Sequence, residues 1–296
     1  MAVAKAIFTH FFTFLLALIM SLMPFKSTHG RNIDTLSDDC KLTVEILSDT
    51  HLEKNGFLRR FMFETALKHI NKAKCTVDSI LVDGDITNYA DEYSIAKYYA
   101  TIKEKTAIPV ISVSGNHDIG HAGDRGVTDI TRTQALENFI KYRNEYLGTS
   151  YTSNYYSTQI NGYKFIVLGD EALYGGAFDE IRMSEEQLRF LDAELAEGTK
   201  DGKPVFVCCH WPIKGYNGED TIWPGSGIDT AVCYDLPSIM SKYKNVYYIS
   251  GHMHSGIKTN EFSKISGLNA AEKIPLPGLE TWTASLNRSL PEESAW

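Results

Sequence analysis

Short apolar runs alternate with amphipathic segments along most of this chain. Runs of strand length, each ending in polar residues or glycine, occupy residues 42–47, 79–82, 108–113, 204–209 and 246–249. Apolar residues at helical spacing predict helices at about 57–73, 92–105, 131–146, 184–196 and 235–242. Strands that alternate with helices predict a parallel or mixed sheet covered on both faces. The binding site of such a sheet lies at the carboxyl ends of its strands.

Two local signals refine this prediction. Asn161-Gly162 separates the β-like runs 155–160 and 163–168, which is a strong signal for a tight hairpin. Ser184 opens a predicted helix and Gln187 follows three positions later, as in a capping box. The C-terminal stretch has β-like alternation without a clear signal. We find no interdomain linker and no internal repeat, and therefore predict one domain over residues 31–296.

Composition and charge exclude one class of partner. The chain is 43% hydrophobic and 22% charged, as in an ordinary globular protein. Its formal net charge is -8, and it contains no basic block. Nucleic-acid binding depends on Lys and Arg replacing the counterions of phosphates. We therefore expect no nucleic-acid partner.

The first thirty residues differ from the rest of the chain. Lys5 precedes a nearly continuous apolar segment at 7–25, and Thr28-His29-Gly30 then offers small residues for cleavage before Arg31. This pattern predicts a secretory signal peptide over residues 1–30. The rival interpretation is an uncleaved membrane anchor, because the apolar segment approaches bilayer-spanning length. We accordingly expect a secreted or periplasmic protein, with membrane association through residues 7–25 as the alternative.

Five cysteines permit up to two disulfides in an exported chain and leave one thiol over. Their connectivity stays open. Cys208 and Cys209 are adjacent within a predicted strand, where successive side chains point to opposite faces of the sheet. We interpret them as two small strand residues.

Polar side chains that bind metals follow five of the β-like runs. Carboxylate, imidazole and amide oxygen are ligands expected for Mn, Fe or Zn. Asp-x-His and His-x-His spacing can place both side chains of a pair on one side if the chain stays extended. Each element alone is common in ordinary turns, but five of them, each directly after a β-like run, indicate a metal site. The residues are Asp49, His51, Asp85, Asn116, His117, His210, His252 and His254.

In order and content these stretches resemble the five motifs of the calcineurin-like metallophosphoesterases. The resemblance spans roughly residues 42–255 and implies a four-layered α/β/β/α sandwich of mixed sheets. It also implies two divalent or trivalent metal ions (Mn, Fe or Zn) at the carboxyl ends of the strands. The matching stretches are Ser48-Asp49-Thr50-His51, Gly84-Asp85-Ile86-Thr87-Asn88, Gly115-Asn116-His117-Asp118, His210 and Gly251-His252-Met253-His254.

The resemblance also implies a role for each residue. One metal would be held by Asp49, His51, Asp85 and His254, and the other by Asp85, Asn116, His210 and His252. Asp85 would therefore bridge the two ions. His117 would not be a ligand but a general acid that protonates the leaving alkoxide. We expect Asp83 and Asp118 to be structural.

Such a site is suited to hydrolysis of phosphate esters, because two metals bind phosphoryl oxygens and make a bridging hydroxide available near neutral pH. Purple acid phosphatases have a tyrosine ligand where this chain has Asn88, and a glycine in place of His51. Serine/threonine protein phosphatases have an arginine where Ser114 stands. The closest resemblance is to the cyclic-nucleotide phosphodiesterase group and its exported relatives.

We therefore expect a small phosphoester substrate, with phosphodiester cleavage first and phosphomonoester hydrolysis second. Esters of lipid head groups at a membrane, and a non-catalytic metal-binding scaffold, are further alternatives. Aromatic residues near the site either contact the substrate or simply cover the end of the sheet. They are Trp211, Tyr216 and Trp223, with His121 in an earlier loop. The sequence does not specify the oligomeric state.

Overall fold

The computed structural model describes residues 40–73, 75–119, 130–171, 181–213, 235–252, 268–270 and 280–286. These residues belong to a compact unit that spans Ile33–Trp296. The predicted signal peptide or anchor, residues 1–30, lies outside the described residues. Within the described part, no helix combines the length and the apolar content needed to cross a bilayer.

The first of two sheets has the strand order β3-β2-β1-β9-β8. The central β1 pairs in parallel with β2, and β2 pairs in parallel with β3. On its other side β1 pairs with the antiparallel β9, which in turn pairs with the antiparallel β8. The bounds are β1 Leu42–Ser48, β2 Ser79–Asp83, β3 Val110–Val113, β8 Leu268–Ala270 and β9 Glu280–Leu286.

The second sheet has the order β4-β5-β6-β7. The antiparallel hairpin of β4 and β5 turns at Asn161 and Gly162, as predicted, and both residues have positive φ. Parallel pairing then joins β5 to β6 and β6 to β7. The bounds are β4 Tyr156–Ile160, β5 Tyr163–Val167, β6 Val205–Cys208 and β7 Val246–Ile249.

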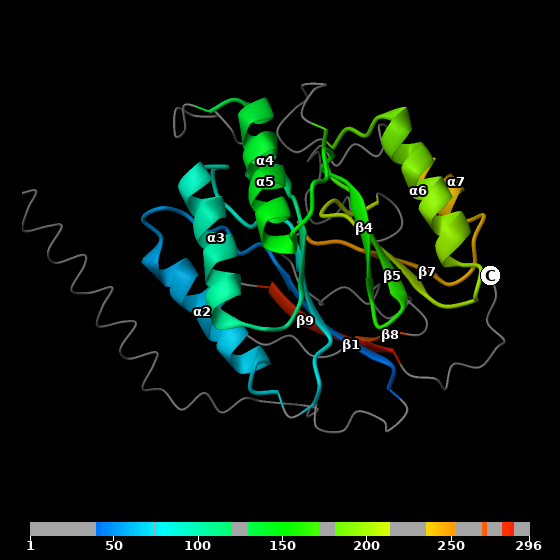
Figure 1. Cartoon of the computed structure of the whole chain (residues 1–296), viewed down its shortest axis with the longest axis horizontal. Helices are drawn as coiled ribbons and strands as arrows, with labels where there is room; N and C mark the ends of the chain where they lie inside the picture. The colour runs from blue at the N-terminus through cyan, green and yellow to red at the C-terminus, as the bar shows by residue number, and fades with distance from the viewer. Residues whose placement is uncertain are drawn as a thin grey trace, which may run out of the picture. The chain divides into compact units, whose positions relative to one another are not determined.

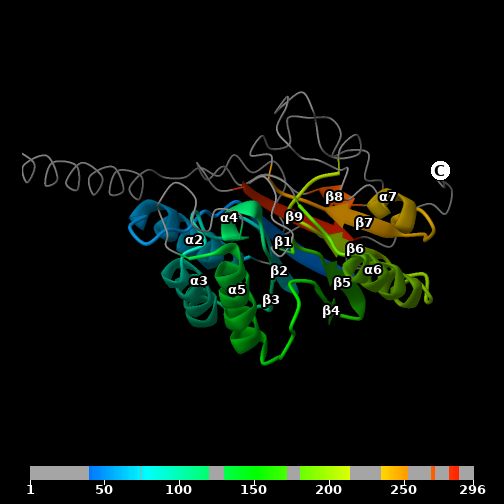
Figure 2. The same cartoon turned by 90° about the horizontal axis from the view of Figure 1, so that it is seen from above.

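Helices cover the outer faces of the two sheets (Figures 1 and 2). Three of them, α2, α3 and α5, pack on the first sheet, whereas α6 and α7 pack on the second. Each sheet thus has helices on one face and the other sheet on its inner face, which confirms the four-layered sandwich. The bounds are α2 Phe57–Ile70, α3 Glu92–Lys105, α4 Asn116–Ile119, α5 Arg132–Leu147, α6 Glu185–Gly198 and α7 Asp235–Met240.

The space between the sheets is filled by apolar side chains from both. Phe165 and Phe206 stack there with ring centroids 4.9 Å apart, beside residues of β1 and β3. Cys208 belongs to this central cluster, while its neighbour Cys209 belongs to the cluster beneath α6 and α7. The two thiols therefore lie on opposite faces of the sheet, as alternation along a strand predicts.

The start of α6 differs from the prediction in its cap. Ser184 accepts a hydrogen bond from the backbone of Gln187, but the Gln187 side chain bonds Gly169 instead of closing a capping box. A complete capping box forms at α5, between Thr131 and Gln134. The Gln187 amide therefore fixes α6 to the end of β5 and does not cap its own helix.

The central phenylalanines should carry much of the stability. Phe206→Ala should lower the free energy of unfolding by about 3 to 5 kcal/mol, because it leaves a cavity between the sheets. Phe57→Ala deletes the same ring where it is 54% exposed and should change stability by less than about 1 kcal/mol. Urea denaturation measures both. Equal losses would mean that the space between the sheets does not form the core.

Candidate metal centre

The two sheets deliver the predicted ligands from neighbouring strand ends. Asp49 and His51 follow β1, Asp85 follows β2, and Asn116 follows β3. From the second sheet, His210 follows β6 and His252 follows β7. All six are buried. The seventh predicted ligand, His254, lies outside the described residues.

Four of these residues have a left-handed backbone. The φ angles are 57° for Asp49, 45° for His51, 48° for Asp85 and 72° for His252. The expectation that Asp-x-His pairs converge through an extended chain is therefore wrong. The chain turns at each residue instead. Left-handed φ is unfavourable for non-glycine residues and often occurs at functional sites.

The loops after β1 and β2 continue the pairing of their strands. The backbone of Asp49 donates to Gly84 O at 3.1 Å, and that of His51 donates to Asp85 O at 2.8 Å. Leu52 then donates to Ile86 O at 2.7 Å. These bonds hold the ligands of both loops in a fixed relation, which compensates for the unusual φ angles.

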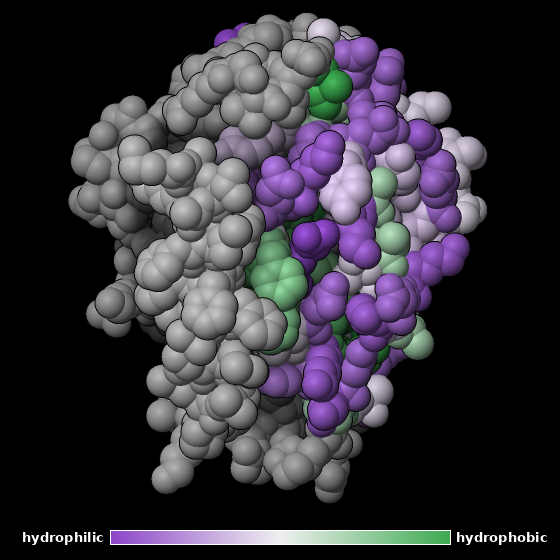
Figure 3. Space-filling model, turned by 90° about the vertical axis from the view of Figure 1, so that its left-hand side faces the viewer, coloured by the Kyte–Doolittle hydropathy of each residue, from purple (hydrophilic) through white to green (hydrophobic). Residues whose placement is uncertain are grey.

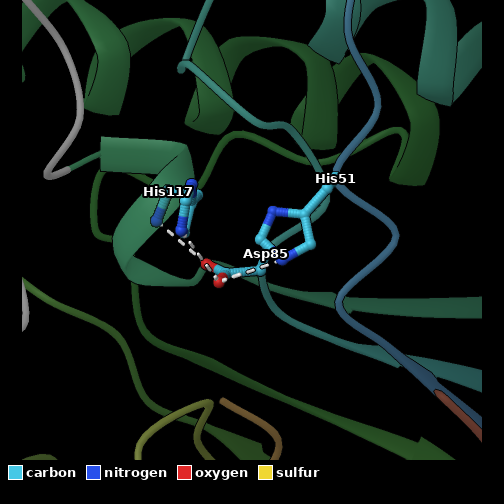
Figure 4. A group of neighbouring side chains, drawn as sticks. All are labelled: His51, Asp85 and His117. Atoms are coloured by element: carbon cyan, nitrogen blue, oxygen red, sulfur yellow. Dashed lines mark hydrogen bonds and ion pairs between the residues drawn. The ribbon is translucent and has the colours of Figure 1, made fainter. Parts of the chain in front are cut away.

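Asp85 lies in the middle of the cluster. Its Oδ2 is 3.7 Å from His51 Nε2, 3.3 Å from His210 Nε2 and 3.9 Å from His117 Nε2. Figure 4 shows the His51 and His117 side chains directed toward this carboxylate from two sides. Asp85 also accepts a hydrogen bond from the His117 backbone at Oδ1, at 2.9 Å.

Metal-binding atoms gather in two groups that share Asp85. The first comprises His51, Asp85 and His117, and the second comprises Asp85, His210 and His252. Asn116 joins the second group, because its Oδ1 is 3.0 Å from His252 Nδ1. Asp49 adjoins both groups, with Oδ1 at 3.8 Å from His51 Nε2 and 3.9 Å from His210 Nε2.

These spacings fit shared ions better than direct hydrogen bonds. Three separations, from His51 to Asp49 and Asp85 and from His210 to Asp49, are 3.7 to 3.9 Å and exceed normal hydrogen-bond distances, whereas His210 Nε2 lies 3.3 Å from Asp85 Oδ2. Two ligand atoms that each lie about 2.1 Å from one ion are about 3 to 4 Å apart. Asp49 and Asp85 are 3% and 1% exposed, and two neighbouring buried carboxylates require a compensating cation. The residues therefore fit a metal centre.

The pKa shifts show the same need for positive charge. Burial alone would raise the pKa of Asp85, but the imidazoles of His210, His117 and His51 outweigh it and hold that pKa below its usual range. Burial would lower the pKa of His210, but Asp85 and Asp49 raise it to about 10. Without a metal, a proton on His210 neutralises these carboxylates. Ligation requires a neutral imidazole, so metal binding displaces that proton.

Backbone carbonyls orient two of the imidazoles. Asp83 O lies 2.6 Å from His210 Nδ1, which directs Nε2 toward Asp85. Asn88 O lies 3.0 Å from His117 Nδ1. A carbonyl can only accept, so each Nδ1 carries a proton. Burial raises the pKa of the Asp83 carboxyl to about 8, and we find no ligand role for that side chain.

Asp118 joins the second and third motifs through backbone hydrogen bonds. Its carboxylate accepts from Ile86 N at 3.1 Å, from Thr87 N at 2.7 Å and from Gly115 N at 2.8 Å. Burial and the charge of Asp85 nevertheless raise the pKa of Asp118 to about 7. These contacts agree with the expected structural role.

Sequence reasoning missed Asn154, which links the two sheets behind the centre. Its Nδ2 donates to Ser114 Oγ at 2.8 Å and to Asp170 O at 2.9 Å. Ser114 follows β3, and Asp170 follows β5. Nη1 of Arg143 donates a hydrogen bond to the backbone carbonyl oxygen of Asn154 at 3.0 Å. No motif marks this asparagine, because its role arises only when the two sheets meet.

Trp211 does not contribute to an aromatic cap. It is 2% exposed and packs in the core beneath α6 and α7, 5.5 Å between ring centroids from His210. Of the two interpretations of this residue, coverage of the sheet end is the one that its burial supports. Tyr216, Trp223 and His121 lie outside the described residues.

Comparison with known proteins identifies the class. A family model described as calcineurin-like phosphoesterase matches residues 42–256, and the chain belongs to this family. Membership supports a metal-dependent phosphoester hydrolase. No match was found among curated protein sequences.

A solved structure supports the fold. A purple acid phosphatase, PPD1, isolated from yellow lupin (Lupinus luteus) seeds is 17% identical at a TM-score of 0.50. The match covers 71% of this chain and 37% of the lupin chain. A cold-active protein-tyrosine phosphatase of a psychrophilic Shewanella species is 13% identical, over 48% of this chain and 47% of its own. Its TM-score of 0.20 carries no argument.

Glycine at position 84 is needed for the approach of His210. A Cβ there would lie 2.3 Å from His210 Nδ1, and the residue has φ +84°. Gly84→Ala should weaken Mn²⁺ binding at least about tenfold by displacing this imidazole, as isothermal titration calorimetry can measure. Gly202→Ala is the matched control, since Gly202 has φ +73° and open space around it. Equal affinities in the two variants would contradict this role.

Proposed function

We propose that this protein is a metal-dependent phosphodiesterase with a dinuclear centre. The observation that carries the proposal is the position of Asp85, which belongs to both groups of metal-binding atoms. A carboxylate shared in this way is suited to bridging two ions. Phosphomonoester hydrolysis by the same centre is the second candidate, because either reaction attacks phosphorus within the same ligand set.

Each ion would have its own protein ligands. Asp49, His51 and Asp85 would hold one, with His254 as the fourth ligand. Asp85, Asn116, His210 and His252 would hold the other. When bound, the ions supply positive charge for phosphoryl oxygens and make hydroxide available near neutral pH.

His117 is the candidate general acid. Its side chain is 21% exposed, whereas those of His51, Asp85 and His210 are at most 8% exposed, so it is the most open to an entering substrate. Its Nδ1 proton is engaged by the Asn88 carbonyl, which leaves Nε2 as the atom that gains and loses a proton. A protonated Nε2 can donate to the leaving alkoxide.

The His117 imidazole also lies close enough to His51 and Asp85 to serve as a third ligand to the same metal ion. The two roles differ in a measurable way, since a ligand is needed for metal retention and a general acid is not. The higher exposure of His117 favours the acid role.

The surroundings of Asn88 support a centre without a tyrosinate ligand. Asn88 stands where purple acid phosphatases have their tyrosine, and its Nδ2 donates to Glu53 Oε2 at 3.2 Å. The side chain is thus engaged by Glu53. This contact supports the expectation that the protein is not a purple Fe(III) enzyme. Phosphodiester hydrolysis therefore stays ahead of phosphomonoester hydrolysis as the proposed activity.

Substitution of His117 separates its two roles. His117→Ala should retain both metals and lower kcat by about 10²- to 10⁴-fold, because only proton transfer is lost. Asp85→Asn should lose metal as well as activity, because it removes the shared charge. Metal content by inductively coupled plasma mass spectrometry and turnover are measured on the same samples. Equal metal loss in the two variants would contradict the general-acid role.

Paired chromogenic esters test the substrate class. The chain from Arg31 retains every described element, so it can be assayed on bis-p-nitrophenyl phosphate and p-nitrophenyl phosphate. We expect faster cleavage of the diester, abolished by chelator and restored by Mn²⁺. Preference for the monoester would support the phosphatase alternative. Silence toward both esters with metals bound would indicate a narrow substrate range or the non-catalytic metal-binding scaffold.

A further inference from the structure

The first two turns of α2 expose large apolar side chains. Phe57, Leu58 and Phe61 are 54%, 36% and 39% exposed. The rings of Phe57 and Phe61 are stacked with centroids 6.2 Å apart. The opposite face of the helix packs in the core through Phe63, Ala66 and Leu67, so the exposed side chains are not needed there. Figure 3 views the side of the molecule on which α2 lies and shows hydrophobic atoms among hydrophilic ones.

Basic residues accompany this apolar surface. Residues 53–68 include four basic residues, Lys54, Arg59, Arg60 and Lys68, against the two acidic residues Glu53 and Glu64, in a chain whose net charge is -8. Lys54 Nζ lies 6.0 Å from the ring centroid of Tyr93, which is 48% exposed. The α2 patch is defined by six residues, namely Lys54, Phe57, Leu58, Arg60, Phe61 and Tyr93.

The positive charge of the α2 patch is available for binding. Within the described part of the chain, no carboxylate pairs with Lys54 or Arg60. Of the carboxylates beside the patch, Glu92 is paired with Lys141, whereas Glu53 accepts a hydrogen bond from the neutral amide of Asn88 and keeps its charge. The patch thus combines exposed aromatic rings with two cations that form no ion pair among the described residues.

We infer that the α2 patch docks on the surface of an anionic lipid bilayer. Aromatic side chains enter the interface between head groups and acyl chains, and Lys and Arg are attracted to acidic head groups. Charge complementarity selects this occupant, because a chain of charge -8 is repelled by an anionic surface except where it is locally basic. A second copy of the chain fits less well, because a symmetric contact would bring like charges together.

The patch is connected to the metal centre. Arg59, within the same helical turns, donates from Nη1 to His51 O at 2.9 Å. The start of α2 also follows the carboxyl end of β1, where Asp49 and His51 lie. Docking through the patch would therefore bring lipid head groups to the edge that carries the centre. Docking itself does not depend on the proposed activity and is measured without turnover.

Vesicle sedimentation of the chain from Arg31 tests this inference. Vesicles of phosphatidylcholine alone are compared with vesicles that contain about 30 mol% phosphatidylserine. We expect binding to the anionic vesicles and at least about tenfold weaker binding to the neutral ones. Phe57→Ser/Phe61→Ser should weaken anionic binding at least about tenfold, because it removes the two stacked rings. Lys54→Gln/Arg60→Gln should weaken it about fivefold for each charge.

A matched pair of leucines controls for loss of exposed apolar surface in general. Leu58 is 36% exposed in the α2 patch, and Leu147 is 37% exposed at the end of α5. Leu58→Ser should weaken vesicle binding, whereas Leu147→Ser should leave it unchanged. Urea denaturation confirms that each variant is folded.

Three results would overturn the inference. They are no binding of the wild-type chain to either vesicle, equal binding to both vesicles, and equal loss in the two leucine variants. Because the readout is binding, an inactive protein that still sediments with anionic vesicles supports docking and counts only against the proposed function.

Discussion

The burial of the Asp85 carboxylate beside that of Asp49 is the constraint on which this site depends. Two carboxylates that are 1% and 3% exposed cannot both stay ionised without positive charge nearby. His51, His117 and His210 surround Asp85, and the pKa of His210 rises to about 10 in response. A pair of metal ions would supply the same compensation permanently and add the chemistry of phosphate-ester hydrolysis.

The four-layered fold makes this concentration of charge possible. Each sheet brings the carboxyl ends of several parallel strands to one edge. Backbone groups in the loops that follow lie past the hydrogen bonds between strands and need other partners. Asp118 accepts backbone donors of two motifs, and Asn154 links the ends of β3 and β5 across the sheets. The left-handed residues Asp49, His51 and Asp85 are tolerated because backbone hydrogen bonds between the loops after β1 and β2 hold them. The α2 patch lies close by, because α2 starts just after the first motif.

Much of the fold could be predicted from local patterns. The α3 helix has the predicted bounds, and β1, β2, β6 and β7 lie where apolar runs of strand length occur. The ligands could be anticipated because each directly follows such a run. The motif order supplied the layered architecture, which the runs alone do not specify.

What could not be predicted depends on contacts between distant segments. The strand β9 pairs with β1 in the middle of the first sheet, yet its alternation is too short to distinguish it from the turns around it. Gln187 has the spacing of a capping residue, but Gly169 provides a tertiary partner for its amide. For Trp211, beside a predicted ligand, the sequence left both substrate contact and coverage of the sheet end open, and only the packing of α6 and α7 shows that it is buried.

The most direct test of a shared carboxylate is the spectrum of the metal-loaded protein. Metal-free protein is titrated with Mn²⁺ and followed by electron paramagnetic resonance, with the bound metal counted at each step. If Asp85 bridges two ions, binding should saturate at two Mn²⁺ per chain, with a spectrum of two exchange-coupled ions. Saturation at one Mn²⁺, or two ions with independent spectra, would contradict a dinuclear centre bridged by Asp85.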